Sequence, residues 1–254
     1  MKIAVLVSVG RHPVSGVARY SRNDAAALTL ALSLARTHGA TLDVLHAGDA
    51  SNAALKEYLA LGARSVEVLE MPPDADPVSQ LSARLRGYDL VLTGTRAEGG
   101  FDSGMLPYRV AHALAMPLVG AAVDLALRDG CAQVRQFMPK GLRRRVEVRL
   151  PALIAVHPLA NAATSYAYAR LREGTIERAA TPHGTTPEQS AWTIRPATAK
   201  PVRLAAAEKR SGHARMLSAT TTESRGGSVV IEGSCVEKAQ VILAYLREHQ
   251  LVDY

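Results

Sequence analysis

The chain has 254 residues, a formal net charge of +7 and a pI near 9.6, a length that fits one α/β domain with an appendage. No apolar run reaches the roughly 20 residues of a membrane-spanning helix, so we expect no direct membrane insertion. Cys131 and Cys235 form no CxxC pair, which indicates a reduced, cytoplasmic protein and gives no support to a metal site.

Strands and helices alternate along the first part of the chain. Continuous apolar runs predict buried strands at 3–9, 41–48, 65–71 and 88–94. Helical patterns at 23–39, 49–63 and 76–87 separate these strands. For the first helix we expect Asn23 or Asp24 as the N-cap and Gly39 as the stop signal. The alternation predicts an α/β fold with a doubly wound, mostly parallel sheet.

The next segment predicts a helix within 101–117 and then antiparallel strands. The strand segments are 118–130, 131–138 and 143–157, joined by the turns RDG and PKG. The last of them carries Arg143, Arg144, Arg145 and Arg149. Alternation divides these arginines between two faces, and no aromatic residues interleave for base stacking. We therefore favour a solvated strand and expect no nucleic-acid partner.

The composition changes after His157. Residues 179–228 are rich in Thr, Ser, Ala and Pro without a sustained period, which is typical of an extended arm or linker. A strand and a helix follow, and Ser234 and Glu237 have the S-x-x-E spacing of a capping box. We thus expect an α/β domain at 1–178, an arm at 179–228 and a C-terminal strand and helix at 229–254.

The loop at 94–106 is the strongest candidate for ligand binding. It follows the fourth strand, and ligands of open α/β sheets bind beyond the carboxyl ends of strands near the topological switch point. Glycines at 94, 99, 100 and 104 permit close approach of backbone amides to an anion. Ser103 and Gly104 would open a helix whose N-terminus favours phosphate. The alternative is a flexible loop in which Asp102 or Ser103 only caps that helix.

Patterns that would indicate catalysis are weak. "GGFDS" resembles the loop of ATP-pyrophosphatases, but Glu98 replaces the leading serine and the loop follows the fourth strand instead of the first. The sequence has no G-x-S-x-G, H-E-x-x-H or G-x-G-x-x-G pattern. The scattered histidines His12, His46, His112 and His157 are interpreted as ordinary surface or strand-end residues. We expect a protein that is not an enzyme by itself.

Several segments, taken in order, resemble the β subunit of electron-transfer flavoproteins. "YSRNDAAALTLALSLA" resembles the family's Asn-Pro-Phe/Tyr-Asp-Glu-x-Ala-Leu segment, and "HAGDASNAALKEYLALGARSVEVLE" its Leu-Arg-x-Ala-Leu-Ala-Met-Gly-Ala-Asp stretch. "YDLVLTGTRAEGGFDSGMLPYRVAHALAMP" is similar to its Asp-Leu-Val-Leu-x-Gly-x-Gln-Ala segment, and "VEVRLPALIAVHPLAN" to its Leu-Pro-Ala-Val-Val-Thr-Val strand. The resemblance covers almost the whole chain and implies a Rossmann-like fold of the adenine-nucleotide α-hydrolase type, with antiparallel additions and a C-terminal arm.

The resemblance also implies a function. Members of this family form a heterodimer with an α subunit that holds the redox-active FAD, and the β subunit carries a structural AMP, or a second FAD in bifurcating members. Electrons pass from a flavin-dependent dehydrogenase to FAD and onward to a quinone oxidoreductase, and the β-subunit arm wraps its partner. The alternative is a stand-alone adenine-nucleotide-binding module resembling universal stress proteins.

Carried over by position, the resemblance implies a nucleotide site within 1–178. Its residues would be Ser8, Ser21, Asn23, Asp24, Ala47, Gly94, Thr95, Arg96, Ala97, Asp102, Ser103, Gly104, Met105 and Leu106. The amides of residues 103–106 would receive phosphate, and Asp102 would orient the loop or bind ribose. Arg96 and Met105 replace family glutamines and Ser21 replaces an asparagine, so AMP, FAD and an empty or different site all stay open.

A second implied site is the surface that docks a redox partner. The family's recognition segment corresponds here to "NAATSYAYARLREGTIE", with Tyr166, Tyr168 and Leu171 as candidate anchors. Aromatic residues on a surface loop are common binding hot spots. The alternative is that these side chains pack against the partner subunit.

Overall fold

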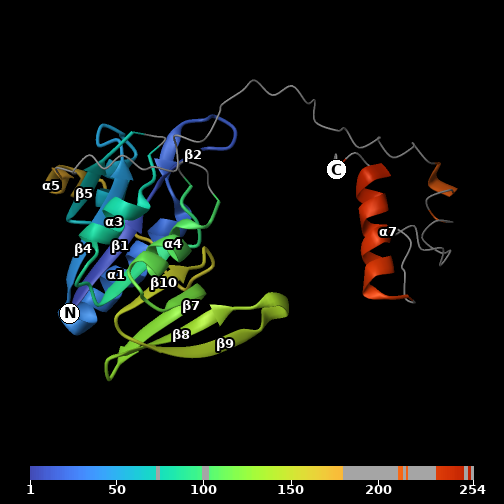
Figure 1. Ribbon diagram of the computed structural model, residues 1–254. Coiled ribbons are helices and arrows are strands. Elements are labelled where there is room, and N and C mark those ends of the chain that lie inside the picture. The colour runs from blue at the N-terminus through green and yellow to red at the C-terminus, as the bar shows by residue number, and fades with distance from the viewer. Residues whose placement is uncertain are drawn as a thin grey trace. The chain divides into compact units, whose positions relative to one another are not determined.

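A nine-stranded sheet forms the centre of the first of two compact units, Met1–Thr193 and Ile194–Tyr254 (Figure 1). The computed structural model describes residues 1–72, 75–98, 103–179, 211–213, 216, 233–248 and 251–252. The strand order is β11-β5-β4-β1-β6-β10-β7-β8-β9. Strands β11 through β7 pair in parallel, and β7, β8 and β9 pair antiparallel. The predicted mostly parallel sheet with antiparallel additions is confirmed.

The strands follow the apolar runs of the sequence closely. Their bounds are β1 Lys2–Val7, β4 Thr41–Gly48, β5 Ser65–Glu70, β6 Leu90–Gly94, β7 Leu118–Arg128, β8 Cys131–Phe137, β9 Arg143–Arg149, β10 Ala152–Val156 and β11 Thr175–Ala179. Strands β1, β6 and β10 lie side by side in the middle of the sheet, where both faces are covered, and β6 and β10 are buried along their whole length. This is why they read as unbroken hydrophobic runs in the sequence.

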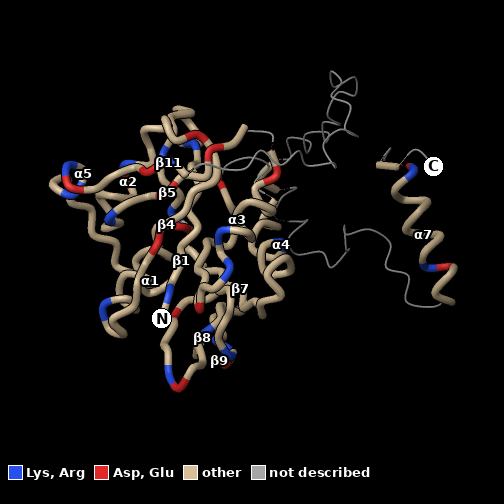
Figure 2. Tube along the Cα trace, turned by 60° about the vertical axis from the view of Figure 1, so that its left-hand side comes forward, with Lys and Arg blue, Asp and Glu red and all other residues tan. Residues whose placement is uncertain are grey.

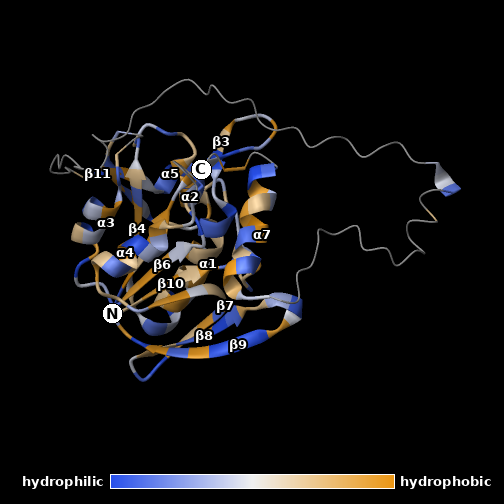
Figure 3. Ribbon diagram, turned by 45° about the vertical axis from the view of Figure 1, so that its right-hand side comes forward, coloured by the Kyte–Doolittle hydropathy of each residue, from blue (hydrophilic) through white to orange (hydrophobic). Residues whose placement is uncertain are grey.

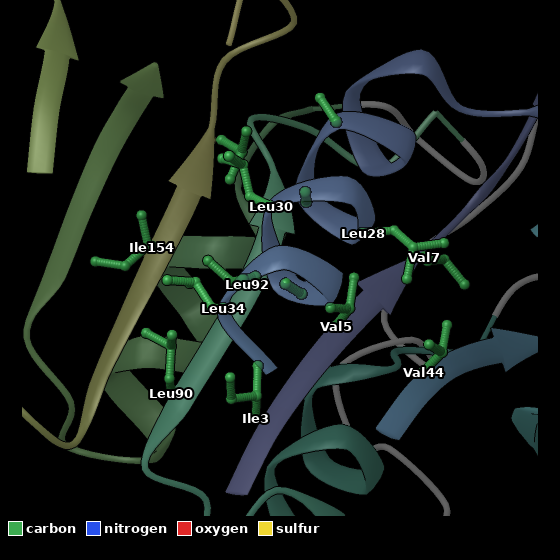
Figure 4. Close-up of a cluster of buried hydrophobic side chains, with 14 of the residues drawn as sticks. Ile3, Val5, Val7, Leu28, Leu30, Leu34, Val44, Leu90, Leu92 and Ile154 are labelled. Atoms are coloured by element: carbon green, nitrogen blue, oxygen red, sulfur yellow. The ribbon is translucent and has the colours of Figure 1, made fainter. Parts of the chain in front are cut away.

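Helices cover both faces of the parallel part. The bounds are α1 Arg22–His38, α2 Leu55–Ala60, α3 Val78–Arg84, α4 Leu106–Ala113 and α5 Arg170–Glu173. Leucines of α1, such as Leu28 and Leu34, pack on one face against β1, β6 and β10 (Figure 4). Helices α3 and α4 contribute Leu81 and Val110 to the apolar layer on the other face. The sheet is therefore the middle layer of an αβα sandwich.

The start of α1 corrects the expected cap. Ser21 is the N-cap, and its Oγ accepts a hydrogen bond from the Asp24 amide. Asn23 and Asp24 lie inside the first turn, where Asp24 is used for a tertiary contact instead. Gly39 ends the helix as expected, in the left-handed conformation with φ of 59°.

The sequence patterns did not predict several short elements. A hairpin of β2 Val9–Arg11 and β3 Ala18–Tyr20 follows β1, and β11 adds an edge strand beside β5. The segment 143–157 forms two strands, β9 and β10, separated by a cis Leu150–Pro151 bond. These pieces lack the length or the alternation by which strands are recognised.

The arginine-rich strand β9 is the other edge of the sheet. Figure 2 shows Lys and Arg along β8 and β9. The Arg144 Nε donates to Gln136 Oε1 at 2.8 Å, and the Arg143 guanidinium lies 4.8 Å from the centre of the Phe137 ring. Charged side chains of this kind protect an edge strand from pairing with other chains.

The second unit contains α7, Cys235–Glu248. The predicted capping box is confirmed, because Ser234 Oγ accepts from the Glu237 amide and the Ser234 amide donates to the Glu237 carboxylate. Figure 3 shows that apolar and polar residues alternate along α7. The predicted strand before this helix, and the predicted arm except Ala179, 211–213 and Met216, lie outside the described residues. No helix among the described residues is long and apolar enough to cross a membrane.

Candidate functional site

The topological switch point of the sheet lies between β1 and β6. From β1 the chain moves outward through β4 to β5, and then returns to the opposite side of β1 as β6. The loops after these two strands consequently diverge, and the carboxyl ends at Ser8 and Gly94 flank the crevice where open α/β sheets bind ligands.

Asp24 bridges the two strand ends at this point. One of its carboxylate oxygens accepts hydrogen bonds from the Ser8 amide at 2.7 Å and the Ser8 hydroxyl at 2.6 Å. The other oxygen accepts from the Gly94 amide at 3.0 Å. A side chain at position 94 would collide with Asp24 and Asn23, so glycine there permits the close approach of α1 to β6. Asn23 and Asp24 are both buried.

Burial dominates the electrostatics of this carboxyl group. Burial raises the pKa of Asp24 to about 7, although the hydrogen bonds from Ser8 and Gly94 act in the opposite direction. The nearby Glu98 carboxylate adds a smaller upward effect. Asp24 therefore changes its protonation near neutral pH.

Tyr58 of α2 connects the same strand end to the start of α1. Its hydroxyl donates to the Ser8 carbonyl at 2.6 Å and accepts from the Ser21 amide at 2.9 Å. The side chain is fully buried, and burial raises the pKa of Tyr58 well above its ordinary value. Sequence reasoning assigned Tyr58 no role, because nothing in a helical apolar pattern distinguishes a core tyrosine whose hydroxyl reaches a strand end.

Glu98 ties the loop after β6 to the hairpin after β1. Its carboxylate forms an ion pair with Arg19 at 2.9 Å and accepts from the Ser21 hydroxyl at 3.1 Å. Its amide donates to the Ser8 hydroxyl at 3.0 Å. We call Glu98, Arg19, Ser21 and Ser8 the Glu98 cluster. Gly10 pairs with Arg19 in the hairpin, and any side chain at position 10 would overlap the Glu98 carboxylate.

The rest of the predicted nucleotide loop lies at the entrance to α4. Thr95 and Ala97 are half-buried and Arg96 is exposed, whereas Asp102 lies outside the described residues. The helix begins at Leu106, two residues later than the expected opening at Ser103 and Gly104. Ser103 Oγ accepts from the Met105 amide at 3.3 Å, and among the described residues the Met105 N-cap makes no side-chain cap hydrogen bond. Pro107 has no N–H, so the helix start presents the backbone amides of Leu106 and Tyr108 at the carboxyl edge of the sheet.

Ala47 lies at the carboxyl end of β4, on the other side of β1. Its neighbour His46 is buried, and Nδ1 of the His46 ring lies 2.9 Å from the Val7 carbonyl oxygen. Sequence reasoning interpreted His46 as an ordinary strand-end histidine. Its burial was not visible from the pattern, because it depends on the loop that follows β4.

The predicted docking residues lie next to one another before and within α5. The rings of Tyr166 and Tyr168 are 5.2 Å apart in an edge-on arrangement, and Tyr168 is 77% exposed. Leu171 differs, because it packs against the main apolar cluster. The two tyrosines are thus available at the surface, while Leu171 anchors α5 to the domain.

The structure brings Ser8, Ser21, Asp24 and Gly94 into one hydrogen-bonded network and places Ala47 and the 95–97 and 103–106 segments around the same edge. A cavity of about 340 Å³ adjoins this edge, lined in part by Thr95, Tyr108, Gln136 and Phe137. Within the described part of the chain, no group of three or more His, Cys, Asp or Glu side chains could hold a metal ion.

Comparisons with known proteins match the sequence of this chain to the electron transfer flavoprotein family. The model of the electron transfer flavoprotein domain matches residues 15–184. The electron transfer flavoprotein subunit beta of Chromohalobacter salexigens is 37% identical over 259 aligned residues, which cover 99% of this chain and 96% of that protein.

Proposed function

The chain belongs to the electron transfer flavoprotein family, and from this premise we propose that it is the β subunit of a heterodimer that carries electrons. Its partner is an α subunit that holds most of the FAD. The heterodimer accepts electrons from a flavin-dependent dehydrogenase and passes them to a quinone oxidoreductase. The β chain is an electron-carrier subunit in the cytoplasm and catalyses no reaction alone.

The observation that carries the nucleotide part of the proposal is the start of α4 beside the switch point, where the described residues provide no side-chain cap at Met105. A helix N-terminus offers free amides and a positive dipole end to an anion. Within the part of the chain that the structure describes, the Met105 N-cap makes no side-chain cap hydrogen bond, and the exposed Arg96 lies two residues after β6 on the same edge. The residues present therefore fit a phosphate at 103–106, with Arg96 adding a charge-assisted contact.

The other side of the crevice does not fit a phosphate. The Ser8 and Gly94 amides donate to Asp24, and the Ser21 hydroxyl donates to Glu98. Two carboxyl groups at this place would repel an anion. We propose that Ser8, Ser21, Asp24 and Gly94 shape the crevice, and that AMP lies with its phosphate at α4 and its base toward Ala47.

FAD at the same site is the alternative occupant, because it shares the adenosine monophosphate portion. The nucleotide would supply structural support between the loops, while the redox chemistry belongs to the FAD of the heterodimer. The stand-alone module resembling universal stress proteins is less well supported, since the relative's similarity extends through the C-terminal region, to 99% of the chain.

Two surfaces suit the proposed partners. The exposed pair Tyr166 and Tyr168 is suited to docking a dehydrogenase, as aromatic side chains are frequent hot spots. Helix α7 exposes Val241 and Ile242, which suits docking on the α subunit. The chain has two cysteines, Cys131 and Cys235, without CxxC spacing, which suits a reducing compartment.

The test is co-expression with an α subunit, followed by acid release and quantification of bound nucleotides. We expect one FAD and one AMP per heterodimer, and a colourless β chain when it is produced alone. Arg96→Ala should weaken AMP binding roughly 3- to 30-fold through loss of a charge-assisted contact, whereas Arg128→Ala, an exposed arginine on β7, should not. A heterodimer without any AMP or second FAD would contradict the nucleotide site.

A further inference from the structure

The antiparallel end of the sheet has one face that the described residues leave exposed. Alternate residues of β8 and β9, such as Val134 and Val146, pack toward the apolar cluster on the α1 side. The residues between them lie on the α4 side of the sheet, and on β9 all of these are exposed. We call four of them the arginine face: Arg135 of β8 and Arg143, Arg145 and Arg149 of β9.

Two of these arginines lie directly opposite one another. Arg135 pairs with Arg145 across β8 and β9, and like charges in this arrangement destabilise a sheet. Asp124 offsets little of the repulsion, because its carboxylate is 3.8 Å from Arg135 and both side chains are about half exposed. Protection of the sheet edge explains charges on β9 but not Arg135, since β8 is an inner strand. Folding therefore gives no reason for this pair, whereas a ligand of opposite charge would relieve the repulsion.

Two aromatic residues, Phe137 and Tyr108, adjoin the arginine face and form what we call the aromatic corner. The Phe137 ring lies between the Arg143 guanidinium, 4.8 Å from its centre, and the stacked His157 ring, with 4.3 Å between the ring centres. Tyr108 of α4 is 53% exposed, and together with Phe137 it lines the cavity of about 340 Å³. Aromatic side chains and arginines around a hollow are typical of protein-binding surfaces.

The charge pattern suits the carboxylates of a protein better than a row of phosphates. Asp124 and Glu147 lie on the same face as the arginines, and both would repel a nucleic acid or an anionic lipid surface. A protein can place its own cations against these two positions and its carboxylates against the guanidinium groups. Obligate subunit interfaces are more apolar than this face, so the pattern fits a partner that associates transiently.

The arginine face lies far from the proposed dehydrogenase surface at Tyr166 and Tyr168. The Ala167 amide between these tyrosines donates to the Ala60 carbonyl of α2, and α2 packs on the α1 side of the sheet near β5 and β11. Strand β9 is seven strand spacings, roughly 33 Å, from β5, and the arginines lie on the opposite side of the sheet. An interface of ordinary size, about 800 Å² on each partner, cannot cover both surfaces.

We propose that the arginine face and the aromatic corner dock an acidic surface of the electron acceptor, so that donor and acceptor bind to different sides of the β subunit. The inference rests on the proposed function, in which a quinone oxidoreductase takes electrons from the heterodimer. Opposite charges accelerate the encounter of short-lived partners and fix their orientation. The association should therefore weaken as the ionic strength rises.

Arg145→Glu tests the proposal and spares the fold. The variant replaces the repulsion between positions 135 and 145 by an attraction, so its free energy of unfolding should be equal or higher. Arg86→Glu, at an exposed arginine in the turn between α3 and β6, makes the same change of charge outside this face and is the matched control. The heterodimer with the full-length β chain is reduced by its dehydrogenase, and its oxidation by the detergent-solubilised quinone oxidoreductase is followed at low and high ionic strength.

We expect Arg145→Glu to raise the KM of the oxidoreductase for the reduced heterodimer roughly 3- to 30-fold at low ionic strength, with kcat unchanged. Arg86→Glu should change this KM less than about twofold, and high ionic strength should narrow the difference between the variants.

Three results overturn the inference and leave the proposed function intact. The first is an unchanged KM in Arg145→Glu. The second is a loss of subunit assembly, or of reduction by the dehydrogenase, in this variant. The third is binding of the unchanged heterodimer to phosphatidylserine vesicles or duplex DNA that Arg145→Glu abolishes while transfer to the oxidoreductase persists. If the unchanged heterodimer passes no electrons to the oxidoreductase, the inference and the acceptor part of the proposed function both fail.

Discussion

Asp24 joins three elements through one carboxyl group, since it holds the ends of β1 and β6 at the first turn of α1. Its pKa of about 7 in the folded chain exceeds the value of 3.8 for an ordinary aspartate. Between these pH values the folded state binds more protons than the unfolded state. The contribution of Asp24 to the free energy of unfolding consequently falls by about 1.4 kcal/mol per pH unit as pH rises from 4 to 7.

Asp24→Asn removes this dependence. The variant should be less stable by about 1–3 kcal/mol at pH 6, because its amide must place an NH₂ group against a backbone N–H of Ser8 or Gly94. The difference should shrink toward pH 8, since only the unchanged chain loses stability over that interval. Urea unfolding of the full-length chain at several pH values measures both effects. Asp124→Asn, an exposed control on β7, should leave the pH profile unchanged, and a constant difference for Asp24→Asn would show that Asp24 stays ionised.

At the scale of single residues, the sequence predicted which positions lie together at the switch point better than what they contact. Ser21, Asp24 and Gly94 were predicted from the family pattern, and they converge at the switch point. The contacts between them could not be predicted, because they depend on tertiary packing. Ser21 caps α1, and the Asp24 carboxylate accepts hydrogen bonds from Ser8 instead. Glu98 and His46 carried no local signal, since their burial is produced by the hairpin and by the loop at Gly48.

At the scale of elements, the Glu98 cluster fastens the β2–β3 hairpin to the loop that leads into α4. The Glu98 side chain is only 12% exposed, so its ion pair with Arg19 is better shielded from water than a surface pair. Its removal would also leave the Ser21 hydroxyl without its acceptor. The hairpin and the proposed phosphate loop should therefore loosen together.

Glu98→Ala tests this coupling. We expect faster amide exchange at 9–11 and 18–20, and a loss of about 1–3 kcal/mol of stability because Arg19 and Ser21 lose a shared, partly buried partner. Hydrogen exchange followed by mass spectrometry measures the first effect. Asp76→Ala, which breaks the Arg109–Asp76 ion pair at 2.6 Å, is the control and should leave the hairpin unchanged. Unaltered exchange at the hairpin in Glu98→Ala would contradict the coupling.

The long elements were predictable because their patterns extend over many residues. The 17-residue helix α1 and the buried strand β6 have strong periodicity or unbroken apolar character. The hairpin strands have three residues each, and β11 carries charged residues at two of its five positions. Such elements form because a neighbouring strand edge offers hydrogen bonds, which a single-sequence pattern does not contain.

At the scale of the whole molecule, the second unit carries an apolar helix surface that we expect a partner to cover. None of the described residues of α7 is buried, and Val236, Val241 and Ile242 are all exposed. A helix of 14 residues gains most of its stability from packing an apolar face. The well-formed capping box at Ser234 and Glu237 fixes where the helix starts, but it offsets little of the cost of exposed apolar surface.

Ile242→Glu should therefore weaken assembly with the α subunit. Burying an isoleucine stabilises by roughly 1.5–3 kcal/mol, so a charge in its place should reduce the affinity of the two subunits at least about tenfold. Gln240→Glu is the matched control, because position 240 lies about 200° around the helix from 242 and is exposed as well. Affinity of the full-length variants for a tagged α subunit measures the effect. Equal loss in both variants would indicate a general charge effect, and no loss in either would show that α7 does not dock through this face.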